Sequence, residues 1–548
     1  MKRIFENFLT TEFDAQNRLS KADIKADESY NFGFDVIDEI AKKTPDKTAM
    51  IWLSHEKEEK RFTFDELRKF SNMTANYFLS LGIKKGDKVL LVLRRHYQFW
   101  FSIIALHKIG AIAIPATNQL TKKDFTYRFN KASVKAVIMT DRGEVANEVE
   151  KALPECPTVD TAIIVNSHRE GWLNFDDGIM MMSDKFDRES MSNPPMRDEH
   201  MLMFFTSGTT GYPKIVAHKH TYSLGHIVTA KYWHNTDPDG IHFTISDTGW
   251  AKAAWGKIYG QWLNETCIFV YDFDRFAPDD ILPMIAKYQI TTFCAPPTMY
   301  RFFIKEDLSK YDFSSLKYAT TAGEALNAEV FKRFKEHTSL EIMEGFGQSE
   351  TTLLIGNLVG DTTRPGSMGR PNPQYTIELL DSDDKPVKNG EVGEICISLK
   401  DGVPYGILDC YYLDEEATNK SIKNGYYHTG DTAWQDKDLY FWYEGRTDDI
   451  IKSSGYRIGP FEIESVILEL PYVLECAVTS AKDAIRGNVV KATIVLTSGS
   501  EGSKHLVSEI QDYVKQHTAP YKYPRIVDFI AALPKTESGK IKRAELRA

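Results

Sequence analysis

The chain has 548 residues, 42% of them hydrophobic, and carries a formal net charge of −10. This length is enough for about three or four compact units, and the negative charge argues against a protein that coats nucleic acid. No Cys-x-x-Cys pair occurs, so neither a zinc ribbon nor a redox pair is indicated, and the low cysteine density suits a reducing compartment. The six scattered cysteines are Cys156, Cys267, Cys294, Cys396, Cys410 and Cys476.

The first two hundred residues alternate between helix-like and strand-like patterns. Helical apolar spacing runs over residues 64–81, and Gly82 stands where a helix C-cap belongs. Short apolar runs at 88–93, 134–139 and 161–165 read as strands. This alternation predicts α/β layers with largely parallel sheets.

The most apolar stretch, residues 99–115, contains His107 and Lys108 and is short for a membrane-spanning helix. It predicts a buried helix followed by a strand at 111–115. At the N-terminus, Glu6 falls inside what would be the apolar region of a signal peptide. We therefore expect a soluble, cytoplasmic chain with no membrane span.

Residues 206–214 read Thr-Ser-Gly-Thr-Thr-Gly-Tyr-Pro-Lys and follow a short apolar run at 201–205 that reads as a buried strand. Glycines let the backbone approach a ligand, successive N–H groups in such a turn form an anion site, and hydroxyls and an ammonium add donors. The lysine follows a proline and precedes Ile215, so this is not a Walker A sequence. The pattern predicts a polyphosphate-binding loop made of Thr206, Ser207, Gly208, Thr209, Thr210, Gly211 and Lys214.

The pattern changes in the last third of the chain. Residues 375–380 and 393–397 read as strands joined by a polar turn, which predicts a small antiparallel β unit. After residue 448 a compact α/β unit is expected. Its elements are helices at 458–468 and 506–517 and strands at 476–480 and 492–496.

Five further motifs follow the phosphate-binding loop. They are Gly-Glu-Ala-Leu at 323–326, Glu-Gly-Phe-Gly-Gln-Ser-Glu at 344–350, Tyr-His-Thr-Gly-Asp at 427–431, Gly-Arg-Thr-Asp-Asp at 445–449 running into Ser-Gly-Tyr-Arg at 454–457, and Pro-Lys-Thr-Glu-Ser-Gly-Lys at 534–540. In this order they resemble the signatures of the adenylate-forming (ANL) superfamily. The chain is most similar to AMP-forming acyl-CoA synthetases of the medium-chain and acetyl-CoA synthetase type, and the resemblance extends over nearly its whole length.

The resemblance implies an α/β fold in two domains. A large N-terminal adenylation domain, residues 1–447, would hold α/β layers with a small β unit and would bind ATP and the acid. A small, mobile α+β domain, residues 448–548, would turn about a hinge at Asp448. The expected partners are small molecules, with no nucleic acid and no membrane, and the expected assembly is a monomer or homodimer.

The resemblance also implies how ATP is held. Glu350 and the hydroxyl of Thr210 would bind Mg²⁺, an ion that takes few protein ligands beside phosphates and water. Asp431 would accept hydrogen bonds from the ribose hydroxyls, and Arg446 would reach the same ribose or the adjoining phosphate. The other residues expected around ATP or AMP are Gly323, Glu324, Ala325, Glu344, Gly345, Phe346, Gly347, Gln348, Ser349 and Arg457.

The resemblance implies that the two half-reactions, adenylation and thioester formation, use different faces of the C-terminal domain. In relatives the lysine that matches Lys540 swings into the site and bridges the carboxylate and the α-phosphate, where it stabilises charge in the adenylation transition state. Lys540, Glu350 and Lys214 are therefore the expected catalytic residues. For thioester formation, CoA would pass a surface made by Ser454, Gly455 and Tyr456, and its phosphates would meet Arg486 and Lys515.

The choice of acid depends on the acyl pocket. In the superfamily the residue before the Gln of Gly-Gln-Ser-Glu lies at the pocket floor, and acetate-specific relatives carry a tryptophan there. Gly347 in that position predicts free volume for a longer or branched acid. Lys252 would either attract a carboxylate or shorten the accepted chain. The predicted apolar lining is Trp233, Trp250, Lys252, Trp255, Cys294 and Gly347.

These features favour an AMP-forming acyl-CoA synthetase. It would convert ATP, CoA and a short- to medium-chain carboxylic acid, branched acids included, to acyl-CoA, AMP and diphosphate through an acyl adenylate. Two alternatives keep the adenylation chemistry: transfer to a carrier-protein thiol, or a dedicated acetyl-CoA synthetase. A third is a non-catalytic nucleotide-binding protein, against which Lys540, Glu350 and Asp431 argue.

Overall fold

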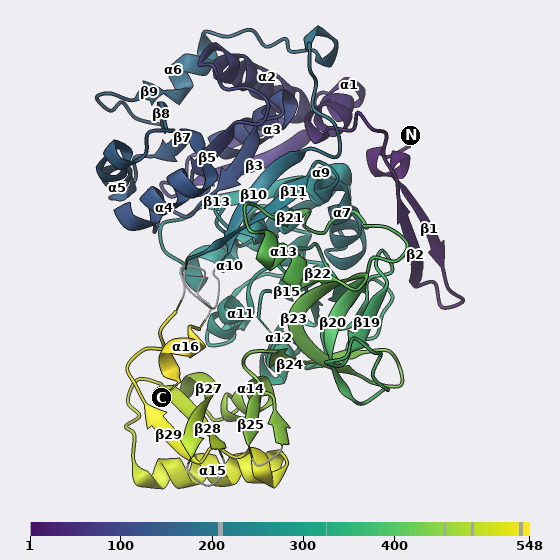
Figure 1. Cartoon of the computed structure of the whole chain (residues 1–548), viewed down its shortest axis with the longest axis vertical. Coiled ribbons are helices and arrows are strands. Elements are labelled where there is room, and N and C mark those ends of the chain that lie inside the picture. The colour runs from purple at the N-terminus through teal and green to yellow at the C-terminus, as the bar shows by residue number, and fades with distance from the viewer. Residues whose placement is uncertain are drawn as a thin grey trace.

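A large N-terminal part and a smaller C-terminal part make up the chain, with the N-terminus far from the smaller part (Figure 1). The computed structural model describes residues 2–206, 212–324, 326–453, 456–483, 487–535 and 541–547, without the side chain of Arg457. The N-terminal part contains two large sheets and a smaller β unit. A hairpin of β1 (Leu9–Phe13) and β2 (Leu19–Ile24) lies beside it.

Eight strands form the first sheet, in the order β21-β11-β10-β6-β5-β7-β8-β9. From β10 to β9 all neighbours are parallel, as buried apolar strands joined by helices predict. The predicted parallel α/β layering is therefore confirmed for this sheet. The strands are β5 (Lys88–Val92), β6 (Ile112–Pro115), β7 (Val134–Thr140), β8 (Thr161–Val165), β9 (Leu173–Asn174), β10 (His200–Thr206), β11 (Lys214–Lys219) and β21 (Cys410–Tyr411).

The second sheet has nine strands, in the order β18-β17-β16-β15-β14-β12-β13-β3-β4. Its six central strands, from β16 to β3, are parallel. Parallel strands end on one edge of a sheet, so the motifs that follow β15 and β16 lie close together. The strands are β3 (Thr48–Ser54), β4 (Glu59–Thr63), β12 (Ile241–Thr244), β13 (Cys267–Asp272), β14 (Thr292–Cys294), β15 (Tyr318–Ala322), β16 (Ile342–Phe346), β17 (Ile355–Gly356) and β18 (Arg370–Pro371).

Helices pack against both sheets. Capping residues and glycines mark where such helices begin and end. Helix α2 (Phe64–Ser80) starts at a capping box of Thr63 and Glu66 and ends before Gly82, whose φ of 79° suits glycine. The remaining helices of the N-terminal part are α1 (Glu39–Lys43), α3 (Gln98–Ile109), α4 (Lys122–Ala132), α5 (Val145–Ala152), α6 (Phe175–Met180), α7 (Tyr222–Val228), α8 (Ala251–Gly256), α9 (Tyr259–Leu263), α10 (Pro278–Lys287), α11 (Pro297–Phe303), α12 (Ala328–Thr338) and α13 (Glu415–Ser421).

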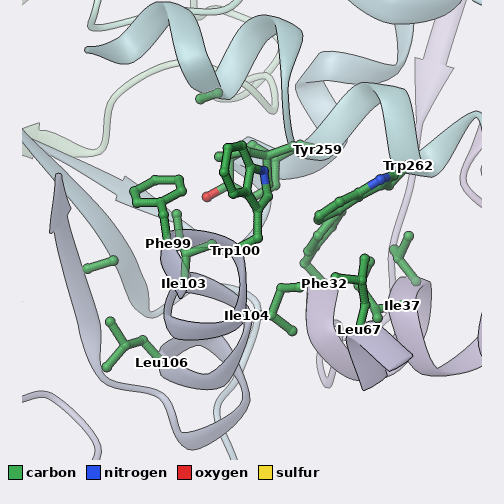
Figure 2. Close-up of a cluster of buried hydrophobic side chains, with 14 of the residues drawn as sticks. Phe32, Ile37, Leu67, Phe99, Trp100, Ile103, Ile104, Leu106, Tyr259 and Trp262 are labelled. Carbon is green, nitrogen blue, oxygen red and sulfur yellow. The ribbon is translucent and has the colours of Figure 1, made fainter. Parts of the chain in front are cut away.

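Helix α3 is buried along its whole length, as the apolar stretch predicts. Figure 2 shows Trp100 of α3 beside Tyr259 of α9, with Trp262 nearby. The Trp100 indole donates to Lys257 O at 2.8 Å, so the buried polar group is satisfied. Within the described residues, no helix combines the length and the apolar character needed to cross a membrane.

The smaller β unit is a five-stranded sheet, and the predicted antiparallel pair is confirmed as β19 and β20. Strand β23 lies next to β20 and carries the Tyr-His-Thr-Gly-Asp motif, while β24 pairs with β23 and ends at Arg446. The strands are β19 (Ile377–Leu380), β20 (Val392–Ser398), β22 (Ile422–Lys423), β23 (Tyr426–Gln435) and β24 (Phe441–Arg446).

The C-terminal part has a three-stranded sheet, β27-β28-β29, and a two-stranded sheet, β25-β26, with helices beside them. The predicted helix at 458–468 starts too early, because Ile458 pairs with Ile451 as a strand residue and Gly459 and Pro460 then open the helix. The elements are β25 (Ile451–Ser453), β26 (Tyr456–Ile458), α14 (Pro460–Ile467), β27 (Val473–Asp483), β28 (Gly487–Leu496), α15 (Lys504–His517), β29 (Ile526–Phe529) and α16 (Arg543–Leu546).

Candidate active site

The predicted phosphate-binding loop connects β10 to β11. The two strands are antiparallel, and Thr206 is the partner of Lys214. Near the C-terminal end of the loop, Tyr212 stacks on Tyr127 of α4 with ring centroids 4.5 Å apart, and the Tyr127 hydroxyl donates to Pro213 O at 3.0 Å. Helix α4 thus holds the end of the loop that leads into β11. Ser207, Gly208, Thr209, Thr210 and Gly211 lie outside the described residues.

Lys214 and Glu350 meet at Tyr411, which the sequence did not single out. The Tyr411 hydroxyl donates to Glu350 Oε1 at 2.9 Å, and the Lys214 ammonium lies 4.9 Å from the centre of the same ring. Burial and the neighbouring Glu350 carboxylate both raise the pKa of Tyr411, which therefore remains a hydrogen-bond donor. A cation and an oxygen donor beside the predicted phosphate loop suit a polyphosphate and a hard cation.

The two segments predicted to flank adenine follow parallel strands. Ala322 at the end of β15 pairs with Gly345 of β16. Glu344 of β16 reaches under the first segment, where its Oε1 accepts from Leu326 N at 3.1 Å. Burial raises the pKa of Glu344 to about 8. The hydrogen bond from Leu326 N to Glu344 therefore connects the two segments.

The other residues of these segments differ in exposure. Gly323 has a φ of 108°, and a Cβ atom there would meet nothing within 4 Å, so its backbone faces open space. Glu324 is held at the surface by Thr298 Oγ1 at 3.0 Å and Arg301 at 3.3 Å. Ala325 lies outside the described residues. Phe346 lies 6.2 Å from the ring of Tyr443.

Asp431 is the centre of a hydrogen-bonded network that joins three of the motifs. Gln348 Nε2 donates to Asp431 Oδ2 at 2.5 Å, the Tyr443 hydroxyl donates to Oδ1 at 2.9 Å, and Arg446 Nη1 lies 3.3 Å from Oδ2. Gln348 is in turn fixed by Tyr427, whose hydroxyl donates to its Oε1 at 2.8 Å. We call Gln348, Asp431, Tyr443 and Arg446 the Asp431 network. Its sequence-predicted members are brought together, and Tyr443 is an addition from the structure.

Electrostatics hold the Asp431 network together. Burial acts to lower the pKa of Arg446, but Asp431 together with Tyr443, Asp448 and Glu350 outweighs it, and the net shift is upward. Arg446 thus stays charged and Asp431 has a permanent cationic partner. The Ser349 carbonyl is held separately, by a hydrogen bond of 2.8 Å from Nε2 of the buried His218.

Two of the predicted acyl-pocket residues, Trp233 and Trp255, form an aromatic wall beside Gly347. A Cβ atom on Gly347 would lie 2.3 Å from Trp255 Cη2 and 2.5 Å from Thr352 O. The structure therefore places the Trp255 indole directly against Gly347. The free volume expected from Gly347 stays a prediction.

Three predicted tryptophans contribute differently to this wall. Trp233 is fully buried and packs on Gly345, where a Cβ atom would lie 2.6 Å from its Cε2. Its ring lies 6.1 Å from that of Trp255 in an edge-to-face contact. Trp250 is only half-buried and caps α8, the helix that also carries Lys252 and Trp255.

Lys252 lies on α8, the helix that carries Trp255, and is hydrogen-bonded to the backbone. Its ammonium donates to Ala322 O at 2.8 Å, directly before the Gly323 segment. Burial lowers the pKa of Lys252. Cys294, at the end of β14, is buried and pairs with Thr320 of β15. Lys252 thus links the acyl wall to the end of β15.

The C-terminal candidates are described only in part. Ser454, Gly455, Arg486 and Lys540 lie outside the described residues, as does the side chain of Arg457. Tyr456 is half exposed and stacks on Tyr521 at 4.1 Å. Lys515 pairs with Asp512 at 2.9 Å and lies 4.5 Å from the ring of Tyr523. At the predicted hinge, Asp448 Oδ1 lies 3.8 Å from Arg446 Nε.

Two family models match the chain in order. Residues 37–412 match the model described as AMP-binding enzyme, and residues 462–540 match its C-terminal domain. The chain belongs to the AMP-binding enzyme family.

Relatives that align over nearly the whole chain identify the kind of AMP-binding enzyme. The human mitochondrial acyl-coenzyme A synthetase ACSM3 is 40% identical over 95% of this chain and 89% of its own. The human mitochondrial acyl-coenzyme A synthetase ACSM5 is 40% identical over 95% and 90%. The chain is therefore an AMP-forming acyl-CoA synthetase, an acid–thiol ligase that uses ATP, CoA and a carboxylic acid, as the motifs predict.

Solved structures agree with the two-part α/β fold. An acyl-CoA synthetase of Brucella canis superposes with a TM-score of 0.72 at 30% identity, over 94% of each chain. The anthranilate CoA ligase AuaEII, solved with anthranoyl-AMP, superposes with a TM-score of 0.87 at 27% identity, over 95% of this chain and 97% of its own. The predicted fold class is confirmed.

Proposed function

We propose that this synthetase activates short- to medium-chain carboxylic acids, branched acids included, and that the Asp431 network and the Lys214–Tyr411–Glu350 contact form its ATP site. The observation that carries the proposal is the Asp431 network, because it joins the 344–350, 427–431 and 445–449 motifs around one carboxylate. A buried carboxylate whose two oxygens are both fixed by donors is held in place to receive the vicinal hydroxyls of a ribose.

The phosphates of ATP would bind at the other end of the site, near Lys214 and Glu350. Lys214 would neutralise the leaving diphosphate together with the loop 206–211, and Glu350 with Thr210 would hold Mg²⁺. The donor chemistry fits, since a carboxylate and a hydroxyl are hard oxygen ligands. Bound there, Mg²⁺ would screen the phosphate charge that repels an attacking carboxylate.

Lys540 would complete the site for adenylation. An ammonium bridging the carboxylate and the α-phosphate acts where charge develops, and electrostatic donors of this kind are worth about 10²- to 10³-fold in rate. The C-terminal domain, residues 448–548, would then turn about Asp448 and present Tyr456, Arg486 and Lys515 to CoA. A cytoplasmic location and a monomeric or homodimeric state are part of the same proposal.

The acid is limited by the aromatic wall. Because the Trp255 indole lies directly against Gly347, Trp255 would set the upper chain length of the acid. The acceptor is CoA rather than a carrier-protein thiol, in line with the relatives named above.

Acid-dependent ATP–pyrophosphate exchange tests the proposal. We would assay linear acids from acetate to decanoate, with branched and aromatic acids, in the presence of Mg²⁺, and then add CoA. We expect exchange and thioester formation with short- to medium-chain acids. Exchange with acetate alone would replace the proposal by a dedicated acetyl-CoA synthetase, and an absence of exchange with every acid would remove it.

A further inference from the structure

Three side chains of the kinds that bind metal ions face one another in the smaller β unit. Cys396 of β20 is the direct partner of His428 of β23, and the two strands lie side by side in Figure 1. Glu394 stands two residues before Cys396, so both side chains leave the same face of β20. A Glu394 carboxylate oxygen, the Cys396 sulfur and a His428 ring nitrogen all lie within 4.8 Å of one another.

The distances between these atoms suit a tetrahedral cation. Nδ1 of His428 lies 3.4 Å from Cys396 Sγ and 3.0 Å from Glu394 Oε2. In a tetrahedral Zn²⁺ site the metal lies about 2.3 Å from sulfur and about 2.0 Å from nitrogen or oxygen, which puts two ligand atoms roughly 3.3–3.6 Å apart. The observed distances are shorter by only about 0.2–0.3 Å, so small side-chain movements would admit the ion.

The atoms on the outer side of the cluster are oriented by neighbours. Glu394 Oε1 accepts from Gly430 N at 2.8 Å, which leaves Oε2 to face the cluster. Nε2 of His428 is buried without a hydrogen-bond partner in the described part of the chain, and Asp384 Oδ1 lies 3.8 Å from it. Asp384 also pairs with Lys423 at 3.3 Å. A histidine that binds a metal through one ring nitrogen donates from the other to a group such as a carboxylate.

The cluster combines burial with access from solvent. Cys396 is fully buried and His428 is buried, while the Glu394 side chain is 22% exposed. Burial raises the pKa of the Cys396 thiol, so a metal–sulfur bond forms as the thiol proton leaves to solvent. A thiolate and an imidazole favour Zn²⁺ and its neighbours among the transition metals over Mg²⁺, which takes oxygen ligands.

A second cluster, made of His200, Asp409 and Cys410, is less suited to a metal ion. Asp409 pairs with His200 at 2.7 Å and with the Lys219 ammonium at 2.8 Å. A cation bound there would share this carboxylate with a charge of the same sign at close range, which is unfavourable. The second cluster therefore serves as the internal comparison.

We infer that Glu394, Cys396 and His428 form a binding site for Zn²⁺ or a related thiophilic divalent cation, with water as the fourth ligand. The site shares no residue with the proposed Mg²⁺ site. Gly430, whose N–H donates to Glu394, directly precedes Asp431. A cation held on Glu394 would therefore also steady the backbone beside the Asp431 network.

Titration of the metal-free enzyme with Co²⁺, without ATP or Mg²⁺, tests the site. Co²⁺ accepts the same ligands as Zn²⁺, and a bond to thiolate gives a charge-transfer band in the near ultraviolet. We expect about one Co²⁺ per chain with this band, displaced by Zn²⁺. Cys396→Ser should abolish the band. Glu394→Gln keeps an acceptor for Gly430 N but loses the charged ligand, and should raise the Kd for Co²⁺ by at least about tenfold.

The matched control is Cys410→Ser, which removes the thiol of the second cluster and should leave the band and the Kd unchanged. A parent enzyme without the band, a band that survives in Cys396→Ser, or a band lost in Cys410→Ser would each overturn the inference. If Cys396→Ser folds poorly, as its melting temperature will report, Glu394→Gln decides, and an unchanged Kd there would contradict the site. The titration uses no acid and no ATP, so its outcome is independent of the proposed function.

Discussion

Single side chains outside the motifs complete the candidate site. Tyr411 donates to Glu350 and faces Lys214, and Tyr443 donates to Asp431. Neither tyrosine stands in a pattern that distinguishes it from core aromatics. Strands β21 and β24 place these two tyrosines at the site, and each contributes through its hydroxyl. A substitution that removes only the hydroxyl therefore tests the contribution.

Tyr411→Phe is expected to weaken the hold on Glu350. A hydrogen bond to a charged group is worth about 1.5–3 kcal/mol, so we expect kcat/KM for ATP–pyrophosphate exchange to fall by roughly 10- to 100-fold, with a higher Mg²⁺ concentration needed for half-maximal rate. Tyr412→Phe, next in sequence, serves as the control. A Mg²⁺ dependence identical to that of the parent enzyme would show that Tyr411 does not position Glu350.

Trp255→Ala is expected to lengthen the accepted acid. The indole lies against Gly347, and its removal opens the wall there. Added methylenes in an apolar pocket change selectivity by about 10- to 200-fold each, so preference for octanoate over butyrate should rise by at least about tenfold. Removing a buried tryptophan also costs about 3–5 kcal/mol of stability, which thermal unfolding will report. An unchanged chain-length profile at reduced stability would mean that Trp255 is core and not pocket wall.

At the scale of elements, the site depends on parallel strands that end together. The Gly323 segment follows strand β15, and the Glu344 segment begins in strand β16. The Glu344 carboxylate accepts a hydrogen bond from Leu326 N and so connects the two segments. The carboxyl is buried, so its proton is retained well above the usual range of a glutamate. This coupling gives a pH signature.

Stability should fall as pH rises from about 4.5 to about 8, the ordinary and the shifted pKa of Glu344. In that window the unfolded chain has released the Glu344 proton and the folded protein keeps it, so folding becomes less favourable with each step in pH. Glu344→Gln keeps the acceptor for Leu326 N and does not titrate. Melting temperature measured against pH should therefore decline less steeply in Glu344→Gln. The surface variant Glu329→Gln should follow the parent curve, and a Glu344→Gln curve parallel to the parent would refute the assignment.

At the scale of the whole molecule, the two parts meet through contacts of more than one kind. Asn327 Nδ2 donates to Ser465 O at 3.1 Å, and the ring of Tyr443 meets Phe461 at 5.8 Å. Single contacts of this kind can be given up at modest cost if the C-terminal domain turns as proposed.

Asn327→Asp separates this contact from local structure. The Asn327 side-chain oxygen caps α12 by accepting from Glu329 N at 2.7 Å, and aspartate keeps that cap while losing the amide donor. A neutral hydrogen bond is worth about 0.5–1.5 kcal/mol, so the ratio of exchange to thioester rate should change by roughly two- to tenfold with little change in melting temperature. An unaltered ratio would mean that the contact does not bias the domain orientation.

Much of the architecture was readable in the sequence. Apolar runs joined by helical segments predicted the parallel strands β5, β7 and β8, and Gly82 marked the end of α2, because these signals act over a few residues. The start of α14 was missed, since pairing of Ile458 with Ile451 overrode the helical pattern. The motif order was enough to predict the enzyme class.

The residues of the candidate site were also predicted only in part from the sequence. Sequence alone determined which residues are available for the chemistry, such as Gln348, Glu350, Asp431 and Arg446, because each stands in a short motif whose spacing is local. Only the tertiary structure decided that Tyr411 and Tyr443 join them and that Trp255 fills the space beside Gly347. These contacts join segments far apart along the chain, and close packing of side chains, not sequence spacing, sets which groups touch.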